Sequence, residues 1–260
     1  MSLSDRNDLL ERVIAIVRAA GGVVMQVYGT DFAVQGKADD SPVTVADQQA
    51  EALIVPALRQ LLPDVPVVAE EAVAAGDVPA IGDRFWLVDP LDGTKEFINR
   101  NGEFTVNVAL VEQGRPVLGV VLAPALDRLF AGAEGVGAFM EDGGRRRALA
   151  CREPPAEGLT VVASRSHGDP QALAAFLNGR KLARLCNAGS SLKLCLVAAG
   201  EADLYPRLGR TMEWDIAAGH AVLAAAGGAV LTLDGAPLGY GKPGFDNPHF
   251  VAAGRCAIQP

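Results

Sequence analysis

A pair of carboxylates and a Gly-Thr dipeptide follow directly after a short apolar run at residues 86–94, which read Trp-Leu-Val-Asp-Pro-Leu-Asp-Gly-Thr. The apolar residues 85–88 predict a buried strand. Pro90 predicts that strand pairing stops there, because proline has no N–H to donate and its φ is fixed. The turn then presents oxygen ligands and anion-binding amides, namely the carboxylates of Asp89 and Asp92, the carbonyl of Leu91, and the amides of Gly93 and Thr94. Such a turn can hold hard metal ions against a phosphate.

Two other interpretations of this turn compete with a metal and phosphate site. Asp-Pro and Asp-Gly are common turn dipeptides, and either one alone is typical of a solvated loop. Phosphatases of the haloacid-dehalogenase type also carry Asp, Gly and Thr, with a nucleophilic Asp two residues before a second Asp. Here the offset is three, and the turn lies about a third of the way along the chain. We therefore set that interpretation aside.

Glu70 and Glu71 follow the predicted strand 65–68, which directly precedes the strand that ends at Asp89. If these strands are neighbours in a sheet, their ends place Glu70 beside Asp89 and Asp92. A solvated charge explains Glu71 as well as a supporting role does.

Asp47 and Asp215 lie at predicted helix starts. Asp47 comes three residues after Thr44, which is a capping-box spacing with Asp in place of Glu. Asp215 opens the last helix, where the helix dipole favours a charged carboxylate. Taken singly, each is typical of a helix start.

The strongest functional pattern is a set of five carboxylates at element ends: Asp47, Glu70, Asp89, Asp92 and Asp215. No set of histidines or cysteines is comparable. Brought together, they would repel one another and require cations. Ligands that are all oxygen select magnesium or manganese over zinc. Two such ions suit phosphoryl displacement by water, so the pattern predicts phosphate ester hydrolysis.

The composition excludes several classes of protein. With 260 residues, 50% of them hydrophobic, the chain can bury a large core. A net charge of −8 gives no general attraction to nucleic acid or to an anionic membrane. The four cysteines have no Cys-x-x-Cys spacing, and no signal peptide or membrane-spanning run is seen, so we expect free thiols in the cytoplasm. Peripheral association with the inner membrane and a homodimer stay open.

The apolar periodicity predicts an α/β fold in two halves with layered sheets. In the first half, it predicts helices from Ser4 to Gly21 or a turn or two beyond and from Thr44 to about 62, and strands at 65–68, 85–88, 105–111, 116–122 and 128–133. Residues 142–147 are expected to be an exposed loop. In the second half, it predicts strands at 161–162, near 185 and at 202–205, and helices after 170, at 190–199 and from 214 to 227. We place the division at 1–150 and 151–260, with most metal ligands in the first lobe.

Three separate motifs resemble the signatures of the inositol monophosphatase superfamily of lithium-sensitive, magnesium-dependent phosphatases. They are Asp89-Pro-Leu-Asp-Gly-Thr94, the pair Glu70-Glu71, and Trp214-Asp-Ile-Ala-Ala-Gly219. The segments 41–47, 93–98, 102–107, 164–167 and 211–215 are similar to its bacterial 3'(2'),5'-bisphosphate nucleotidase (CysQ) branch. That branch converts 3'-phosphoadenosine 5'-phosphate to AMP, a clearance step in sulfur metabolism. The resemblance implies a layered αβαβα sandwich.

The resemblance also implies roles for individual residues. Glu70, Asp89 and the Leu91 carbonyl would hold one Mg²⁺, and Asp89, Asp92 and Asp215 would hold a second. Asp47 and Thr94 would orient the attacking water, and the amides of Gly93 and Thr94 would receive the phosphate. Asp39 is a candidate ligand for a third Mg²⁺.

Substrate choice depends on other positions. Inositol monophosphatases commonly carry a Glu where this chain has Arg207, and an arginine suits a second phosphate better than a polyol. Glu213 is also assigned to substrate binding. Lys193, Arg165 and Arg210 can supply further positive charge, although single surface cations are typically inert. Ser166 and His167 either line the nucleotide pocket or only shape a loop.

These residues leave two alternatives to the bisphosphate nucleotidase. An inositol phosphate or histidinol phosphate phosphatase would use the same scaffold. A non-catalytic sensor would bind magnesium and nucleotide without turnover, but it would have no need of the water-activating pair. No nucleic-acid partner is expected.

Overall fold

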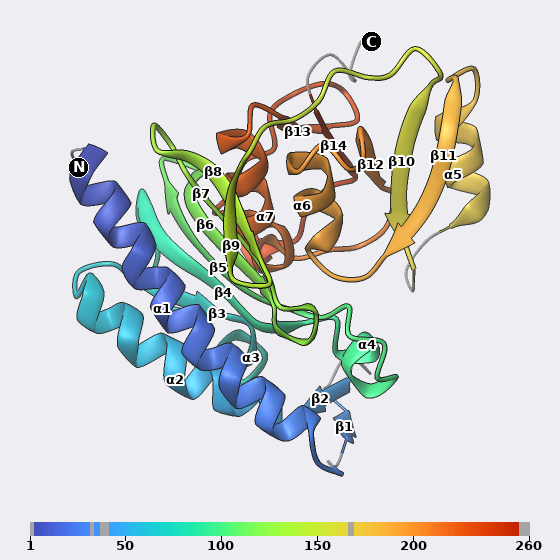
Figure 1. Cartoon of the computed structure of the whole chain (residues 1–260). Coiled ribbons are helices and arrows are strands. Elements are labelled where there is room, and N and C mark those ends of the chain that lie inside the picture. Colours follow the sequence, from blue (N-terminus) through green and yellow to red (C-terminus); the bar gives the residue numbers. More distant parts are fainter. Residues whose placement is uncertain (1–2, 32–33, 37–41, 166–168, 255–260) are drawn as a thin grey trace.

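Apolar runs of this chain form the strands of two large sheets, which alternate with helices to give five layers (Figure 1). The structure is a computed structural model that describes residues 3–31, 34–36, 42–165 and 169–254. Helix layers alternate with sheet layers, which confirms the expected layered α/β sandwich. Asp39, Ser166, His167 and Cys256 lie outside the described residues.

The larger sheet has seven strands in the order β3-β4-β5-β6-β7-β8-β9. Their bounds are β3 (Val67–Ala69), β4 (Arg84–Asp92), β5 (Thr105–Glu112), β6 (Arg115–Ala123), β7 (Arg128–Ala133), β8 (Gly137–Asp142) and β9 (Arg145–Leu149). All neighbours pair antiparallel except β3 and β4, which are parallel. The predicted hairpins between 105 and 133 are therefore confirmed.

The smaller sheet has five strands in the order β11-β10-β12-β14-β13. They are β10 (Leu159–Ser164), β11 (Leu182–Ala188), β12 (Leu204–Arg207), β13 (Ala229–Thr232) and β14 (Phe250–Ala253). β10 lies parallel to both β11 and β12, so these three strands end at the same edge. A further pair, β1 (Val34–Gly36) and β2 (Pro42–Thr44), forms a separate two-stranded sheet.

The helices occupy three layers around the two sheets (Figure 1). They are α1 (Leu3–Tyr28), α2 (Val45–Leu61), α3 (Glu70–Ala74), α4 (Thr94–Ile98), α5 (Pro170–Leu177), α6 (Leu192–Ala198) and α7 (Glu213–Ala225), with 3-10 turns η1 (Pro124–Leu126) and η2 (Pro243–Phe245). α1 and α2 cover one face of the larger sheet. α6 and α7 fill the space between the sheets, and α5 packs outside the smaller one. Apolar side chains are buried where these helices pack on the sheets, and this burial is the main contribution to the stability of the fold.

Parallel pairing of β3 with β4 places two predicted site residues at one edge. Ala69 lies opposite Val88, so Glu70 and Asp89 each follow directly after a paired residue. This confirms the neighbouring strands that the sequence analysis required.

Three local expectations were wrong. β4 does not end at Pro90, because a bulge carries the chain past Pro90 and pairing resumes between Asp92 and Thr105. Residues 145–147 are not loop but belong to β9, which forms a hairpin with β8 through Gly143 and Gly144. Lys193 is not a surface cation, since only 5% of the residue is exposed.

In the part of the chain that the structure describes, no helix combines the length and apolar character needed to cross a membrane. Cys151, Cys186 and Cys195 are free thiols, as expected.

Candidate active site

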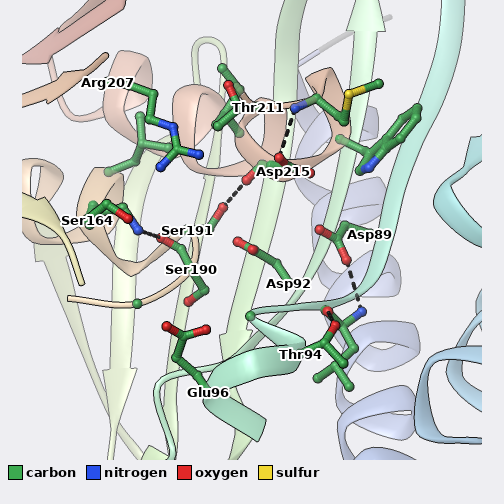
Figure 2. A pocket seen from close by; sticks show the side chains of 18 of the residues that line it. Asp89, Asp92, Thr94, Glu96, Ser164, Ser190, Ser191, Arg207, Thr211 and Asp215 are labelled. Atoms are coloured by element: carbon green, nitrogen blue, oxygen red, sulfur yellow. Dashed lines mark hydrogen bonds between the residues drawn. The ribbon is translucent and has the colours of Figure 1, made fainter. Parts of the chain in front are cut away.

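The carboxyl ends of strands from both sheets meet at a cleft of about 420 Å³. One wall comes from Glu70 and the segment Asp89 to Glu96. The other comes from the ends of β10, β11 and β12 and from the first turn of α7. Figure 2 shows Asp89 and Asp92 of β4 and Asp215 of α7 approaching the cavity, with Arg207 on another side. Residues distant in the sequence therefore form one site.

Three of the predicted metal ligands form a compact group. Ligand oxygens of Glu70, Asp89 and Asp215 all lie within 4.8 Å of one another. Asp89 is only 1% exposed, while the other two are partly open to the cleft. A set of carboxylate oxygens so close together can hold a hard divalent cation.

Backbone amides orient these carboxylates. Asp89 Oδ1 accepts a hydrogen bond from Leu91 N at 3.0 Å, across the bulge at Pro90. Asp215 Oδ2 accepts from Met212 N at 2.8 Å at the start of α7 (Figure 2). Gly93 precedes α4 with φ 89°, a left-handed conformation that favours glycine. The local structure thus presets the ligand positions.

The electrostatics of the site favour a bound cation. Burial, with the nearby Glu70 and Glu96 carboxylates, raises the pKa of Asp92 to about 6, although Lys193 opposes this. Burial and the charges of Asp92 and Glu70 also raise the pKa of Asp215 well above its ordinary value. A positive ion would relieve both effects, so the donor set fits Mg²⁺.

Asp47 has both of the features that the sequence suggested. Its Oδ2 accepts from Thr44 N and from Thr44 Oγ1, each at 2.8 Å, which forms the predicted cap of α2. Its other oxygen, Oδ1, lies 3.4 Å from Thr94 Oγ1, the donor in that contact. Thr94 lines the cleft, so Asp47 reaches the site through this hydroxyl.

Two cations line the side of the cleft formed by the smaller sheet. The Lys193 ammonium donates to Ser190 O at 2.5 Å and to Ala188 O at 3.3 Å. Burial lowers the pKa of Lys193 to about 8, so the group is mostly charged at about pH 7. Arg207 is 8% exposed, and its guanidinium donates to Gly209 O and Arg210 O. These two cations can bind a second anionic group of a substrate whose first phosphate lies at the carboxylates.

Three other predicted residues lie apart from the cleft wall, namely Arg165, Glu213 and Glu71. Arg165 is paired with Glu103. The fully buried Glu213 accepts from the amides of Gly241 and Lys242 and pairs with the Lys242 ammonium, so it holds the loop between β13 and β14. Glu71 borders a separate groove beside α2. Arg210 does line the cleft, and it pairs with Asp246.

Sequence analysis missed Ser190 and Glu96 as residues of the cleft (Figure 2). Ser190 Oγ is buried without a hydrogen-bond partner in the structure, and its backbone has φ 45°. Glu96 is 4% exposed beside Asp92. Glu96 lay two residues after Thr94, inside a segment already noted for its resemblance, whereas Ser190 gave no signal of its own.

The chain belongs to the inositol monophosphatase family, whose model matches residues 5–259. Both the fold and the carboxylate group described above agree with this family.

Among similar proteins, the 3'(2'),5'-bisphosphate nucleotidase CysQ of Escherichia coli K12 is 50% identical over 93% of this chain and 98% of its own length. The crystal structure of CysQ from Bacteroides thetaiotaomicron is 37% identical, with a TM-score of 0.82 over 98% of this chain and 99% of that one. An inositol monophosphatase of Thermotoga maritima is 30% identical, with a TM-score of 0.78 over 95% of this chain and 92% of that one.

Proposed function

We propose that this protein is a magnesium-dependent phosphatase that hydrolyses the 3'-phosphate of 3'-phosphoadenosine 5'-phosphate, giving AMP and phosphate. The observation that carries the proposal is a single cleft with a carboxylate wall and, opposite it, the buried cations Lys193 and Arg207. A substrate with two phosphates matches both walls. Relatives up to 50% identical over most of the chain bear the name of this activity.

In this proposal the carboxylates hold two magnesium ions. Glu70, Asp89 and the Leu91 carbonyl would bind one, and Asp89, Asp92 and Asp215 would bind the other. Bound there, the ions supply charge neutralisation and a water of lowered pKa. A third ion at Asp39 remains part of the proposal, at a residue outside those described.

The chain's own groups supply positioning and proton transfer. Thr94 Oγ1 would orient the attacking water, and Asp47 would accept its proton through the Thr94 contact. The amides of Gly93 and Thr94 would hold the phosphoryl oxygens. Lys193 and Arg207 would hold the 5'-phosphate, beside the unpartnered hydroxyl of Ser190.

The proposal keeps residues 1–150 as the lobe with most metal ligands and 151–260 as the lobe that completes the site. A cytoplasmic location fits a nucleotide substrate. Peripheral membrane contact and a homodimer remain open within the proposal.

An inositol phosphate or histidinol phosphate phosphatase is the second candidate, favoured by the similarity to the T. maritima inositol monophosphatase. The two cations argue against it, because a polyol presents hydroxyls rather than a second phosphate.

The test is phosphate release from equal concentrations of 3'-phosphoadenosine 5'-phosphate, inositol 1-phosphate and histidinol phosphate, with magnesium and with or without lithium. We expect a kcat/KM for the bisphosphate at least about a hundredfold above the others, since leaving the buried cations without a second phosphate costs several kcal/mol. Arg207→Met should remove most of that preference while phosphate release from inositol 1-phosphate persists. A clear preference for inositol 1-phosphate would refute the proposal.

A metal and nucleotide sensor would bind the bisphosphate but release no phosphate. Asp47→Asn separates the two cases, because the variant should bind the nucleotide while turnover falls by about a hundredfold or more. An unmodified protein that binds without any turnover would support the sensor.

A further inference from the structure

The loop Gly189–Ser191 lines the cleft and contacts two of its aspartates. Its Ser191 amide donates a hydrogen bond to the Asp92 carboxylate. The Ser191 hydroxyl donates to the backbone carbonyl of Asp215 (Figure 2). Ser190, between them, faces the cleft with its hydroxyl unpartnered. A displacement of this loop would therefore disturb both the carboxylate wall and a bound substrate.

Glu103, which does not line the cleft, holds this loop at its first residue. Its Oε2 accepts from the Gly189 amide at 2.7 Å and from Arg165 Nε at 3.0 Å. Its Oε1 accepts from Arg165 Nη2 at 2.9 Å, which makes the ion pair bidentate. The same Nη2 donates to Asn187 O at 3.3 Å. The pair thus ties the loop after α4 to the ends of both β10 and β11.

Close packing makes the loop dependent on this contact. A Cβ at position 189 would lie 2.6 Å from the Glu103 carbonyl oxygen and 2.9 Å from Glu96 Cγ, so only glycine fits there. The next residue, Ser190, has φ 45°, which costs energy for a side chain other than glycine. A backbone in this conformation needs external contacts to hold it.

An exposed ion pair ordinarily contributes little. This pair differs because its geometry is bidentate and because one carboxylate oxygen is shared with a backbone amide. By contrast, the exposed pair of Arg146 with Glu11 joins β9 to α1, and neither residue lines the cleft.

We propose that Glu103 and Arg165 are a positioning pair that fixes the Gly189–Ser191 loop and thereby sets the affinity of the cleft for its phosphorylated substrate. Neither residue touches the reacting phosphate. The inference rests on the proposed function only for the choice of substrate.

The test is a double-mutant cycle with Glu103→Gln, Arg165→Gln and the double variant, measured with the ester that the unmodified protein hydrolyses best. We expect each single change to raise KM by about five- to tenfold, the effect of losing one charge-assisted hydrogen bond, with kcat within about twofold. The double variant should be no worse than the worse single variant, because both remove the same contact. Arg165→Lys keeps the charge but not the fork, and it should give an intermediate KM.

Glu11→Gln is the matched control, and it should leave KM unchanged. Thermal unfolding of all variants separates positioning from stability, since loss of a half-exposed pair should lower Tm by no more than about 2 °C. An unchanged KM in both single variants, strictly additive effects, or a KM that rises only in step with falling Tm would overturn the proposal.

The outcome is independent of substrate identity. A preference for inositol 1-phosphate would refute the proposed function. The double-mutant cycle would then be measured with that ester. If the unmodified protein hydrolyses no ester, the same ratios are read from the Kd of 3'-phosphoadenosine 5'-phosphate.

Discussion

His220 should make the stability of this fold depend on pH. It lies in α7 with only 9% of its surface exposed, and its Nδ1 is 2.8 Å from the Tyr240 hydroxyl. Burial lowers the pKa of His220 from its ordinary value of 6.5 to about 4. The neutral ring is therefore the form that the folded protein prefers.

The sign follows from linkage. Above about pH 6.5 the histidine is neutral in both states, and its contribution is fully present. As the pH falls, the unfolded chain binds a proton that the folded protein resists binding, so stability is lost towards pH 4. A pKa difference of about 2.5, at about 1.4 kcal/mol for each pH unit, gives a total loss of about 3.5 kcal/mol. About 2 kcal/mol of this should be lost between about pH 7 and pH 5.

Urea unfolding of the unmodified protein and of His220→Gln, followed by circular dichroism across this pH range, measures the effect. The amide can still form a hydrogen bond with Tyr240 but does not titrate, so the difference between the two curves isolates the histidine from the carboxylates. NMR titration of the folded protein gives the His220 pKa even if the variant is unstable. Parallel curves, or a His220 pKa near 6.5, would refute the reasoning.

Three further outcomes follow from the site. Magnesium affinity should fall as the pH drops through about 6, because protons compete with the metal for Asp92 and Asp215, whose pKa values are raised. Calorimetry of magnesium binding in two buffers should detect the release of protons. Thr94→Ala should lower kcat by about a hundredfold and Thr94→Ser should restore most of it in a phosphate-release assay, because the hydroxyl that contacts Asp47 is what matters. Glu213→Ala should destabilise the fold by about 3 kcal/mol in urea unfolding without changing magnesium affinity, since the buried carboxylate holds the loop between β13 and β14; an unchanged unfolding midpoint would contradict this role.

Much of the fold was predictable because its signals are local. Apolar periodicity gave the longer helices and the hairpins between residues 105 and 133 correctly, but not the short helices α3 and α4. Pro90 predicted the interruption in the regular pairing of β4. The return of pairing at Asp92 depends on the partner strand β5 and has no local signal in the sequence. For the same reason, the three arginines at 145–147 resembled a loop, although β8 pairs them into a hairpin.

By itself, the sequence determined which chemical groups the site contains, because the type and order of Glu70, the Asp89–Thr94 turn and Asp215 can be read along the chain. Tertiary structure decided their neighbours. Parallel pairing of β3 with β4 placed Glu70 at Asp89, and the packing of α7 between the sheets added Asp215. It also buried Lys193 in the cleft and paired Arg165 with Glu103. Burial and pairing arise from contacts between distant segments, and they decide whether a cation is inert, binds a ligand or holds a loop in place.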